Sequence, residues 1–167
     1  MKRLIFLPVF IFISVLCFSQ GKYAGPILIK LINKTFTDEK NIPGLKGYEL
    51  REGSMITGID DPQPQFLSVL IKGKNRVVIL SVKEDTVTTV QHIVDVIEIK
   101  NVLPGWEIRT AGCQNGDSEG EIIVALVNPG KGQTVKSVSR AWRCNRDKIR
   151  FEKISTKKIN CINEVQD

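Results

Sequence analysis

The sequence predicts an all-β protein: a single small antiparallel β domain of about seven strands, in a meander closed into a barrel or folded as a sandwich. From Phe66 onward, short runs rich in Val, Ile and Thr recur, and these residues favour strands. The runs lie roughly 12 residues apart and are separated by turn-like stretches. No segment between them has the length and pattern of a crossover helix, so neighbouring strands are expected to be antiparallel.

Each expected strand rests on a local pattern. The first two are joined by a two-residue loop in which Gly73 supplies the positive φ of a type II′ turn. The fourth alternates in polarity from Trp106 to Cys113, as a half-buried strand does. The fifth is apolar throughout and ends at Pro-Gly, which suits burial on both faces. In chain order the expected strands are 66–71, 76–82, 87–99, 106–113, 122–127, 135–144 and 149–155.

The last two strands are expected to form a hairpin around a loop at 145–148, where Asn and Asp favour a turn. In that register Cys144 faces Ile149, and Trp142 faces Phe151. One face of the first strand of this hairpin then carries Val138, Arg140, Trp142 and Cys144. Large aromatic side chains and cysteine are most often buried, so we expect the aromatic residues and Cys144 to be core.

The remainder of the chain divides into three parts. Residues 1–19 form an export signal, and 20–65 form a loop-rich N-terminal segment that packs on the sheet or joins it. Within that segment, 26–36 is expected to be one short helix or a strand. Residues 66–167 form the antiparallel β domain and a polar C-terminal tail. The apolar fraction of 42% and charged fraction of 25% are typical of a globular protein.

The export signal is predicted from its charge and hydropathy. Lys2 and Arg3 precede an apolar run, and small residues stand before a cut at Gln20. The apolar run is shorter than the ~20 residues that span a bilayer as a helix, so cleavage is expected rather than a permanent membrane anchor. Cys17 allows a lipoprotein as the alternative, although the residue before it is larger than the lipidation pattern requires. The leader resembles those of gram-negative bacterial exported proteins.

The cysteine count predicts one disulfide. Without the leader, Cys113, Cys144 and Cys161 remain, and an odd number in an oxidising compartment suggests one pair and one free thiol. We expect Cys113 to pair with Cys161, because both stand near strand ends while Cys144 shares a face with Trp142. Closing a loop of this length stabilises a fold by roughly 4 kcal/mol in the chain-entropy model. Three cysteines without CxxC spacing and a single His predict no metal site.

The sequence offers little catalytic chemistry. The one histidine, His92, has no orienting carboxylate within reach along its strand. Phosphate-binding loops, dinucleotide fingerprints and zinc-protease motifs are missing from the sequence, so no cofactor is expected. We therefore expect a protein that is not an enzyme.

The distribution of charge suggests a contact surface. Removing Lys2 and Arg3 with the leader lowers the net charge from +6 to +4. Residues 140–158 carry eight basic and two acidic side chains, so the rest of the mature chain is slightly acidic. A basic hairpin tip suits an anionic cell-surface component or an acidic protein, and no nucleic acid is expected. The candidate binding residues are Arg143, Arg146, Lys148 and Arg150. The alternative is that these charges protect an edge hairpin from pairing with another chain.

Together these patterns predict a small exported β-rich binding or interaction protein of unknown ligand, in the periplasm, at the cell surface or outside the cell. Two alternatives remain at this point. A secreted hydrolase would assemble its site from distant strands, with Asp60, Asp61, His92 or Glu98. A β-barrel carrier would bind a small apolar ligand in a pocket lined by Trp106, Trp142 and Phe151.

Overall fold

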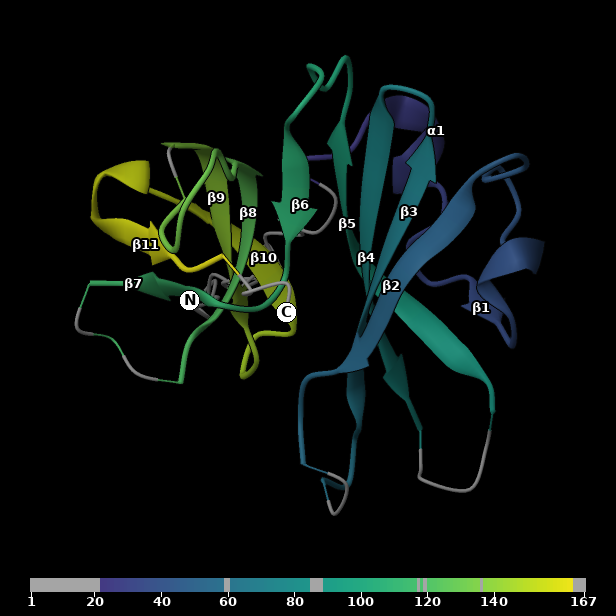
Figure 1. Cartoon of the computed structure of the whole chain (residues 1–167). Coiled ribbons are helices and arrows are strands. Elements are labelled where there is room, and N and C mark those ends of the chain that lie inside the picture. Colours follow the sequence, from purple (N-terminus) through teal and green to yellow (C-terminus); the bar gives the residue numbers. More distant parts are fainter. Residues whose placement is uncertain are drawn as a thin grey trace, which may run out of the picture.

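A computed structural model of the chain describes residues 22–58, 61–84, 89–116, 118, 120–135 and 137–163, so the predicted export signal lies outside the described residues. Antiparallel strands dominate, which confirms the all-β prediction (Figure 1). The helical elements are one short helix, α1 (Pro26–Ile29), and two 3-10 turns, η1 (Glu39–Asn41) and η2 (Thr156–Lys158).

The larger sheet has five strands in the order β1-β5-β4-β3-β2. Its members are β1 (Thr35–Phe36), β2 (Glu49–Met55), β3 (Gln65–Lys72), β4 (Asn75–Lys83) and β5 (Gln91–Ile99). Lys72 pairs with Asn75 across a two-residue loop in which Gly73 has a φ of 54°, so the predicted hairpin between β3 and β4 is confirmed. The N-terminal segment contributes β1 and β2 to this sheet, and it also covers one face of it with α1 and η1.

A second sheet has four strands in the order β10-β9-β8-β6. Its members are β6 (Glu107–Arg109), β8 (Ile122–Asn128), β9 (Ser137–Asn145) and β10 (Arg150–Ile154). A two-stranded sheet of β7 (Cys113–Asn115) and β11 (Ile159–Cys161) lies beyond it. Among the described strands, no hydrogen-bonded ladder joins these sheets into one barrel. The two large sheets form separate layers, as in a sandwich (Figure 1).

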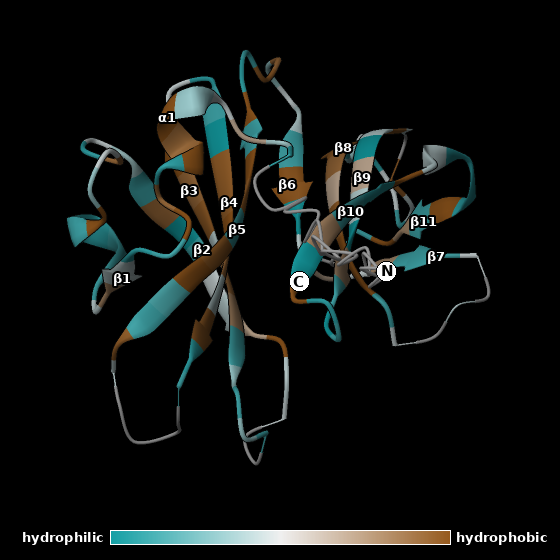
Figure 2. Cartoon of the chain, turned by 180° about the vertical axis from the view of Figure 1, so that it is seen from behind, coloured by the Kyte–Doolittle hydropathy of each residue, from teal (hydrophilic) through white to brown (hydrophobic). Residues whose placement is uncertain are grey.

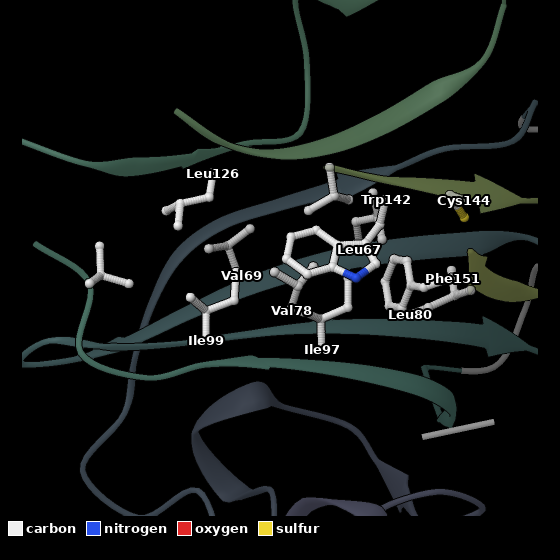
Figure 3. Packing of buried hydrophobic residues seen from close by; sticks show 12 residues of the cluster. Leu67, Val69, Val78, Leu80, Ile97, Ile99, Leu126, Trp142, Cys144 and Phe151 are labelled. Carbon is white, nitrogen blue, oxygen red and sulfur yellow. The ribbon is translucent and has the colours of Figure 1, made fainter. Parts of the chain in front are cut away.

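Three clusters of buried hydrophobic side chains fill the spaces between neighbouring layers. The central one fills the space between the two large sheets, where Trp142 and Phe151 pack against Leu67, Val78 and Leu80 (Figure 3). A second cluster lies between the five-stranded sheet and the N-terminal segment. The third lies between the four-stranded sheet and the β7–β11 pair. The middle parts of the central strands β3, β4 and β5 are accordingly mostly hydrophobic, whereas the strand ends carry polar residues (Figure 2). The strand β8 contributes to two clusters, so its predicted burial on both faces is confirmed.

The single strand expected at 106–113 is wrong, because a turn divides it. β6 ends at Arg109, and the chain turns through Gly112, whose φ is 70°. β7 then begins at Cys113 and pairs with β11 in the tail. The disulfide partner of Cys113 is Cys161, so the covalent bond and the ladder hold this strand against the outer face of the sandwich.

The hairpin between β9 and β10 forms, but the expected register is wrong by two residues. Phe151 pairs with Cys144, and the four-residue loop therefore ends at Ile149 rather than Lys148. The side chain of Asn145 accepts a hydrogen bond from the Lys148 backbone N–H at 3.0 Å, and Ile149 adopts a φ of 45° to close the loop. A shift of two residues keeps every side chain on its expected face, so the aromatic residues and Cys144 still reach the core.

A β-bulge in β9 corrects one further expectation. Val127 pairs with Val138 while Leu126 pairs with Arg140, so Ser139 is the extra residue. An extra residue reverses the alternation of faces beyond it. Val138 therefore packs in the cluster beneath β7 and β11 instead of beside Trp142.

Candidate functional site: a cleft at the open side of the sandwich

The two large sheets are tied together along one side by a buried carboxylate. Asp95 of β5 is 1% exposed, and its Oδ2 accepts a hydrogen bond of 2.8 Å from the backbone N–H of Phe151 in β10. Its Oδ1 accepts another, also 2.8 Å, from the N–H of Val96. A bulge next to it leaves Val94 as the extra residue, because Ser81 pairs with Ile93 and Leu80 with Asp95. This bulge directs the carboxylate towards the opposite sheet.

The other side of the sandwich is open. There β2 is the outermost strand of the five-stranded sheet and β6 is the outermost strand of the four-stranded sheet. A cleft of about 700 Å³ lies between them. Ligand sites in proteins occupy about 300–1,000 Å³, so the cleft has the size of a binding site.

A third β-bulge, in β2, brings an arginine into this cleft. Leu50 pairs with Leu70, which belongs to the cluster between the five-stranded sheet and the N-terminal segment. Glu52 pairs instead with Val69, which belongs to the central cluster. Arg51 is the extra residue between them, and both Arg51 and Glu52 line the cleft. Neighbouring residues of a regular strand point to opposite faces. The bulge therefore places two consecutive charged side chains on the same side, as bulges near functional sites often do.

Arginines from three strands line the cleft, and among the described residues only one of them forms an ion pair with a carboxylate. Arg109 of β6 pairs with Glu107 in the same strand. Arg76 of β4 donates through one nitrogen to the backbone oxygens of the β3–β4 turn, at 2.7 and 3.0 Å. Glu52 accepts a hydrogen bond from Thr110. Among the described residues, neither Arg51 nor Arg76 forms an ion pair.

Apolar side chains also line the cleft. They are Val69 and Ile71 of β3 and Ile108 of β6. Ile108 and its neighbour Trp106 also pack against the central core. A guanidinium beside apolar surface is less well screened than one in open water. The arrangement therefore suits a ligand that carries both a negative group and an apolar part.

The residues predicted to form a basic patch lie at the β9–β10 hairpin, on another part of the molecule, and carboxylates surround several of them. Arg143 pairs with Glu121 at 3.0 Å and with Glu152 at 2.7 Å. Arg150 and Lys148 contact the same Glu152, at 3.1 and 3.7 Å. Three cations thus share two carboxylates, which lowers the positive charge that this surface offers to a ligand. Arg146 lines a smaller hollow of about 260 Å³ together with Arg143.

The carboxylate of Glu152, which these three cations contact, has a pKa well below its ordinary value. Hydrogen bonds from Arg143, and then from Arg150 and Asn145, lower the pKa of Glu152 to about 2, although burial acts in the opposite direction. The same contacts raise the pKa of Arg143. Glu152 therefore remains ionised in the folded protein at pH values where an unfolded glutamate is protonated.

This shift predicts a loss of stability in acid that depends on one residue. The folded pKa lies below the ordinary value of 4.5, so the stabilisation is fully present above about pH 5 and is lost as the pH falls towards 2. Because the network is partly exposed, Glu152→Gln is expected to lower the free energy of unfolding by only about 1 kcal/mol at pH 7. Urea unfolding of both proteins between pH 7 and 2.5 measures the difference, which is expected to shrink with acid. Glu49→Gln, which removes an exposed carboxylate without an ion pair among the described residues, is the control; a difference that stays constant with pH contradicts the prediction.

The third cysteine is free and buried, as predicted. Burial, and to a lesser degree the nearby charge of Asp95, raises the pKa of the Cys144 thiol to about 12. A neutral, buried thiol is a poor nucleophile, so Cys144 serves packing.

The side chains of the two alternative sites are dispersed or buried. His92 pairs with Glu84 at 3.0 Å, whereas Glu98 lies at the other end of β5 and accepts a hydrogen bond from the N–H of Gly25. Asp61 accepts one from the N–H of Gln63 in the loop after β2. Asp60 lies outside the described residues. Trp142 and Phe151, proposed to line an apolar pocket, are packed in the core with 3% and 2% of their surface exposed, and Trp106 packs at its margin.

The described residues contain neither a metal-binding cluster nor a membrane-spanning helix. The described part of the chain contains no group of three or more His, Cys, Asp and Glu side chains arranged to hold a metal ion. None of its helices is long and apolar enough to cross a membrane. No protein-family model, curated protein or solved structure matches the chain. The geometry of the cleft is therefore the main indication of function.

Proposed function

We propose that this chain is a small exported binding protein that holds an anionic ligand in the cleft between β2 and β6. The observation that carries the proposal is the position of Arg51. A bulge directs its side chain into the cleft, and the described residues offer it no carboxylate partner. An arginine placed in this way suits a carboxylate, sulfate or phosphate group, which accepts two parallel hydrogen bonds from a guanidinium.

Two further observations support the exported, binding character of the protein. The Cys113–Cys161 disulfide is compatible with an oxidising compartment, as expected of a protein with a cleaved leader. The mature chain is basic, which favours encounter with an anionic cell-surface component or an acidic protein.

Binding to defined anionic probes tests the proposal. Trp106 is next to Glu107, which lines the cleft, and Trp142→Phe leaves Trp106 as the only tryptophan, so its fluorescence is a probe close to the cleft. The probes are uronic-acid oligosaccharides, poly-glutamate and phosphatidylglycerol vesicles. We expect saturable binding of at least one probe, and about a tenfold or larger loss of affinity in Arg51→Glu, because a hydrogen bond to a charged group contributes about 1.5–3 kcal/mol.

The matched control is Arg146→Glu, the same charge reversal at the β9–β10 hairpin. If the cleft is the site, this variant keeps most of its affinity. If Arg146→Glu loses binding and Arg51→Glu keeps it, the hairpin tip is the binding surface and the cleft proposal is wrong. If none of the probes binds, the anionic ligand itself is wrong.

A further inference from the structure

The nature of the β2 edge narrows the class of ligand. Building on the proposed function, we propose that the ligand is an extended polypeptide segment that adds to the open edge of β2 as an extra strand. Its acidic side chain then meets Arg51 in the cleft. Strand addition supplies affinity through backbone hydrogen bonds, and alternate side chains supply specificity.

The register of β2 shows which backbone groups are available. The N–H of Ile56 donates to the carbonyl oxygen of Gln65 at 2.9 Å. In an antiparallel pair, every second residue directs its N–H and C=O towards the partner strand. Glu52 and Ser54 therefore direct theirs towards β3, whereas Gly53 and Met55 direct theirs away from the sheet. Within the described part of the chain, the stretch from Gly53 to Met55 is thus an open edge with hydrogen-bonding groups for another strand.

Gly53 follows the bulge at Arg51 and leaves open space at the edge of β2. A Cβ built on it has no atom within 4 Å, and its backbone lies outside the left-handed region. Neither space nor conformation within the described chain therefore requires glycine at this position. Glycine within a strand often accompanies a bulge, as it does here two residues after Arg51. The open space beside Gly53 leaves room for an added strand at this edge.

The side chains of β2 predict the pattern of the ligand. Leu50 and Met55 are each 43% exposed, and both pair with residues on the outer side of the sheet. Arg51 faces the cleft on the inner side. A strand laid along β2 that presents apolar residues outward and an acidic residue inward matches both faces. We therefore expect alternating apolar and acidic residues in the ligand.

Charge complementarity favours an acidic segment over a neutral or basic one. The two carboxylates at the cleft already have partners, Glu52 in Thr110 and Glu107 in Arg109. Arg51 and Arg76 are the cleft charges without an ion pair among the described residues. Their strands lie two positions apart in the sheet, which corresponds to about 10 Å, and both side chains line the cleft. The charged residues and the bulge of β2 also discourage pairing of this edge with arbitrary strands. A peptide that lacks an acidic residue to meet Arg51 is therefore expected to bind less well.

Selection from a displayed library of random peptides, about eight residues long, tests the inference. We expect the wild-type protein to enrich peptides with alternating apolar and acidic residues. Arg51→Glu is expected to enrich basic residues at the acidic position instead. When a peptide selected by the wild-type protein binds, amide exchange at Gly53 and Met55 is expected to slow, because these N–H groups acquire acceptors.

Two substitutions of one residue separate strand addition from other modes of binding. Gly53→Pro removes the outward N–H, and we expect at least a tenfold loss of affinity for the selected peptide. Gly53→Val keeps that N–H, its Cβ has no described atom within 4 Å, and valine favours the strand. Because strand side chains point out of the plane of the sheet, this variant is expected to keep the affinity. A peptide that is N-methylated at alternate residues makes the same test from the ligand side, because it lacks the N–H groups that would donate to β2. Its affinity is expected to fall likewise, and this measurement does not depend on the folding of Gly53→Pro.

The outcomes distinguish this inference from the proposal on which it rests. Arg51-dependent binding of an oligosaccharide or a vesicle, with no peptide enriched, overturns strand addition and leaves the anionic cleft in place. Peptide binding that is unaffected by Gly53→Pro and by N-methylation also overturns it. A dimer in sedimentation analysis that Gly53→Pro dissolves shows that β2 pairs with a second copy of the chain instead. No Arg51-dependent binding of any kind overturns both.

Discussion

Breaking the Cys113–Cys161 disulfide is expected to lower the free energy of unfolding by about 4 kcal/mol. The two cysteines are 48 residues apart in sequence, and the loop between them contains β8, β9 and β10. In the unfolded chain the crosslink restricts that whole loop, so its removal increases the entropy of the unfolded state. A typical domain is stable by only 5–15 kcal/mol, which makes this a large effect.

The structure adds a local reason for the same expectation. β7 and β11 are three residues each, and a two-stranded ribbon of this length is not stable by itself. The disulfide joins directly paired residues of these strands, and Ile159 packs beside it in the cluster under β8. Loss of the bond therefore also loosens the cover of that cluster.

Urea unfolding with and without reductant measures the effect. The reduced wild-type protein keeps both side chains and reports the crosslink alone, whereas Cys113→Ala with Cys161→Ala also removes packing atoms and should be less stable still. Reductant should leave that double variant unchanged, because Cys144 has no partner. A difference below about 1 kcal/mol between the oxidised and reduced wild-type proteins contradicts the prediction.

Much of the fold is encoded in local patterns, which is why the sequence predicts it. The turn at Gly73 and the apolar run of β8 depend on neighbouring residues alone. The pairing of Cys113 with Cys161 also follows from local signs, because Cys144 lies on the face of an aromatic residue and so belongs to the core. The hairpin at Asn145 is predicted as an element, but its register is set by the loop geometry at Ile149, which has a positive φ that β-branched residues seldom adopt.

Local sequence patterns do not predict the candidate site, for two physical reasons. Arg51, Arg76 and Arg109 are far apart in sequence and meet only because β2 and β6 are the open edges of different sheets. The side of the strand on which Arg51 lies depends on a bulge, which an alternating pattern does not reveal. The one local sign was the charged Arg51-Glu52 pair followed by Gly53 in a weakly alternating strand, since glycine within a strand often accompanies a bulge or a close approach. The basic run at 140–158 was a stronger sequence signal, but Glu121 and Glu152 partly neutralise it.

Asp95→Ala is expected to destabilise the protein by roughly 3 kcal/mol, because two backbone N–H groups in the core lose their acceptor. One belongs to Val96 beside it, and the other belongs to Phe151 in the opposite sheet. An unsatisfied buried donor costs about 1–3 kcal/mol. The seam between β5 and β10 is also where the sandwich is held closed, so the loss affects the contact between the two sheets.

Asp61→Ala is the matched control for this substitution. Asp61 also accepts a hydrogen bond of 2.9 Å from a backbone N–H, that of Gln63, but it does so at the surface. Water replaces the lost acceptor there, so the cost should stay below about 1 kcal/mol. The two variants remove the same atoms and differ chiefly in burial. Equal losses for both would mean that the buried carboxylate adds nothing to the joining of the sheets.

Amide hydrogen exchange shows where the effect of Asp95→Ala arises. The N–H of Phe151 is held by the Asp95 carboxylate, so its exchange is expected to accelerate more than that of residues in β3 and β4. A selective loss of protection in β10 shows that the carboxylate closes this side of the sandwich. A uniform loss across both sheets shows instead that the variant is destabilised only as a whole. In the first case, the contact between β5 and β10 also fixes the spacing of the two sheets at the cleft between β2 and β6. Ligand affinity should then fall in Asp95→Ala, although Asp95 does not touch the cleft.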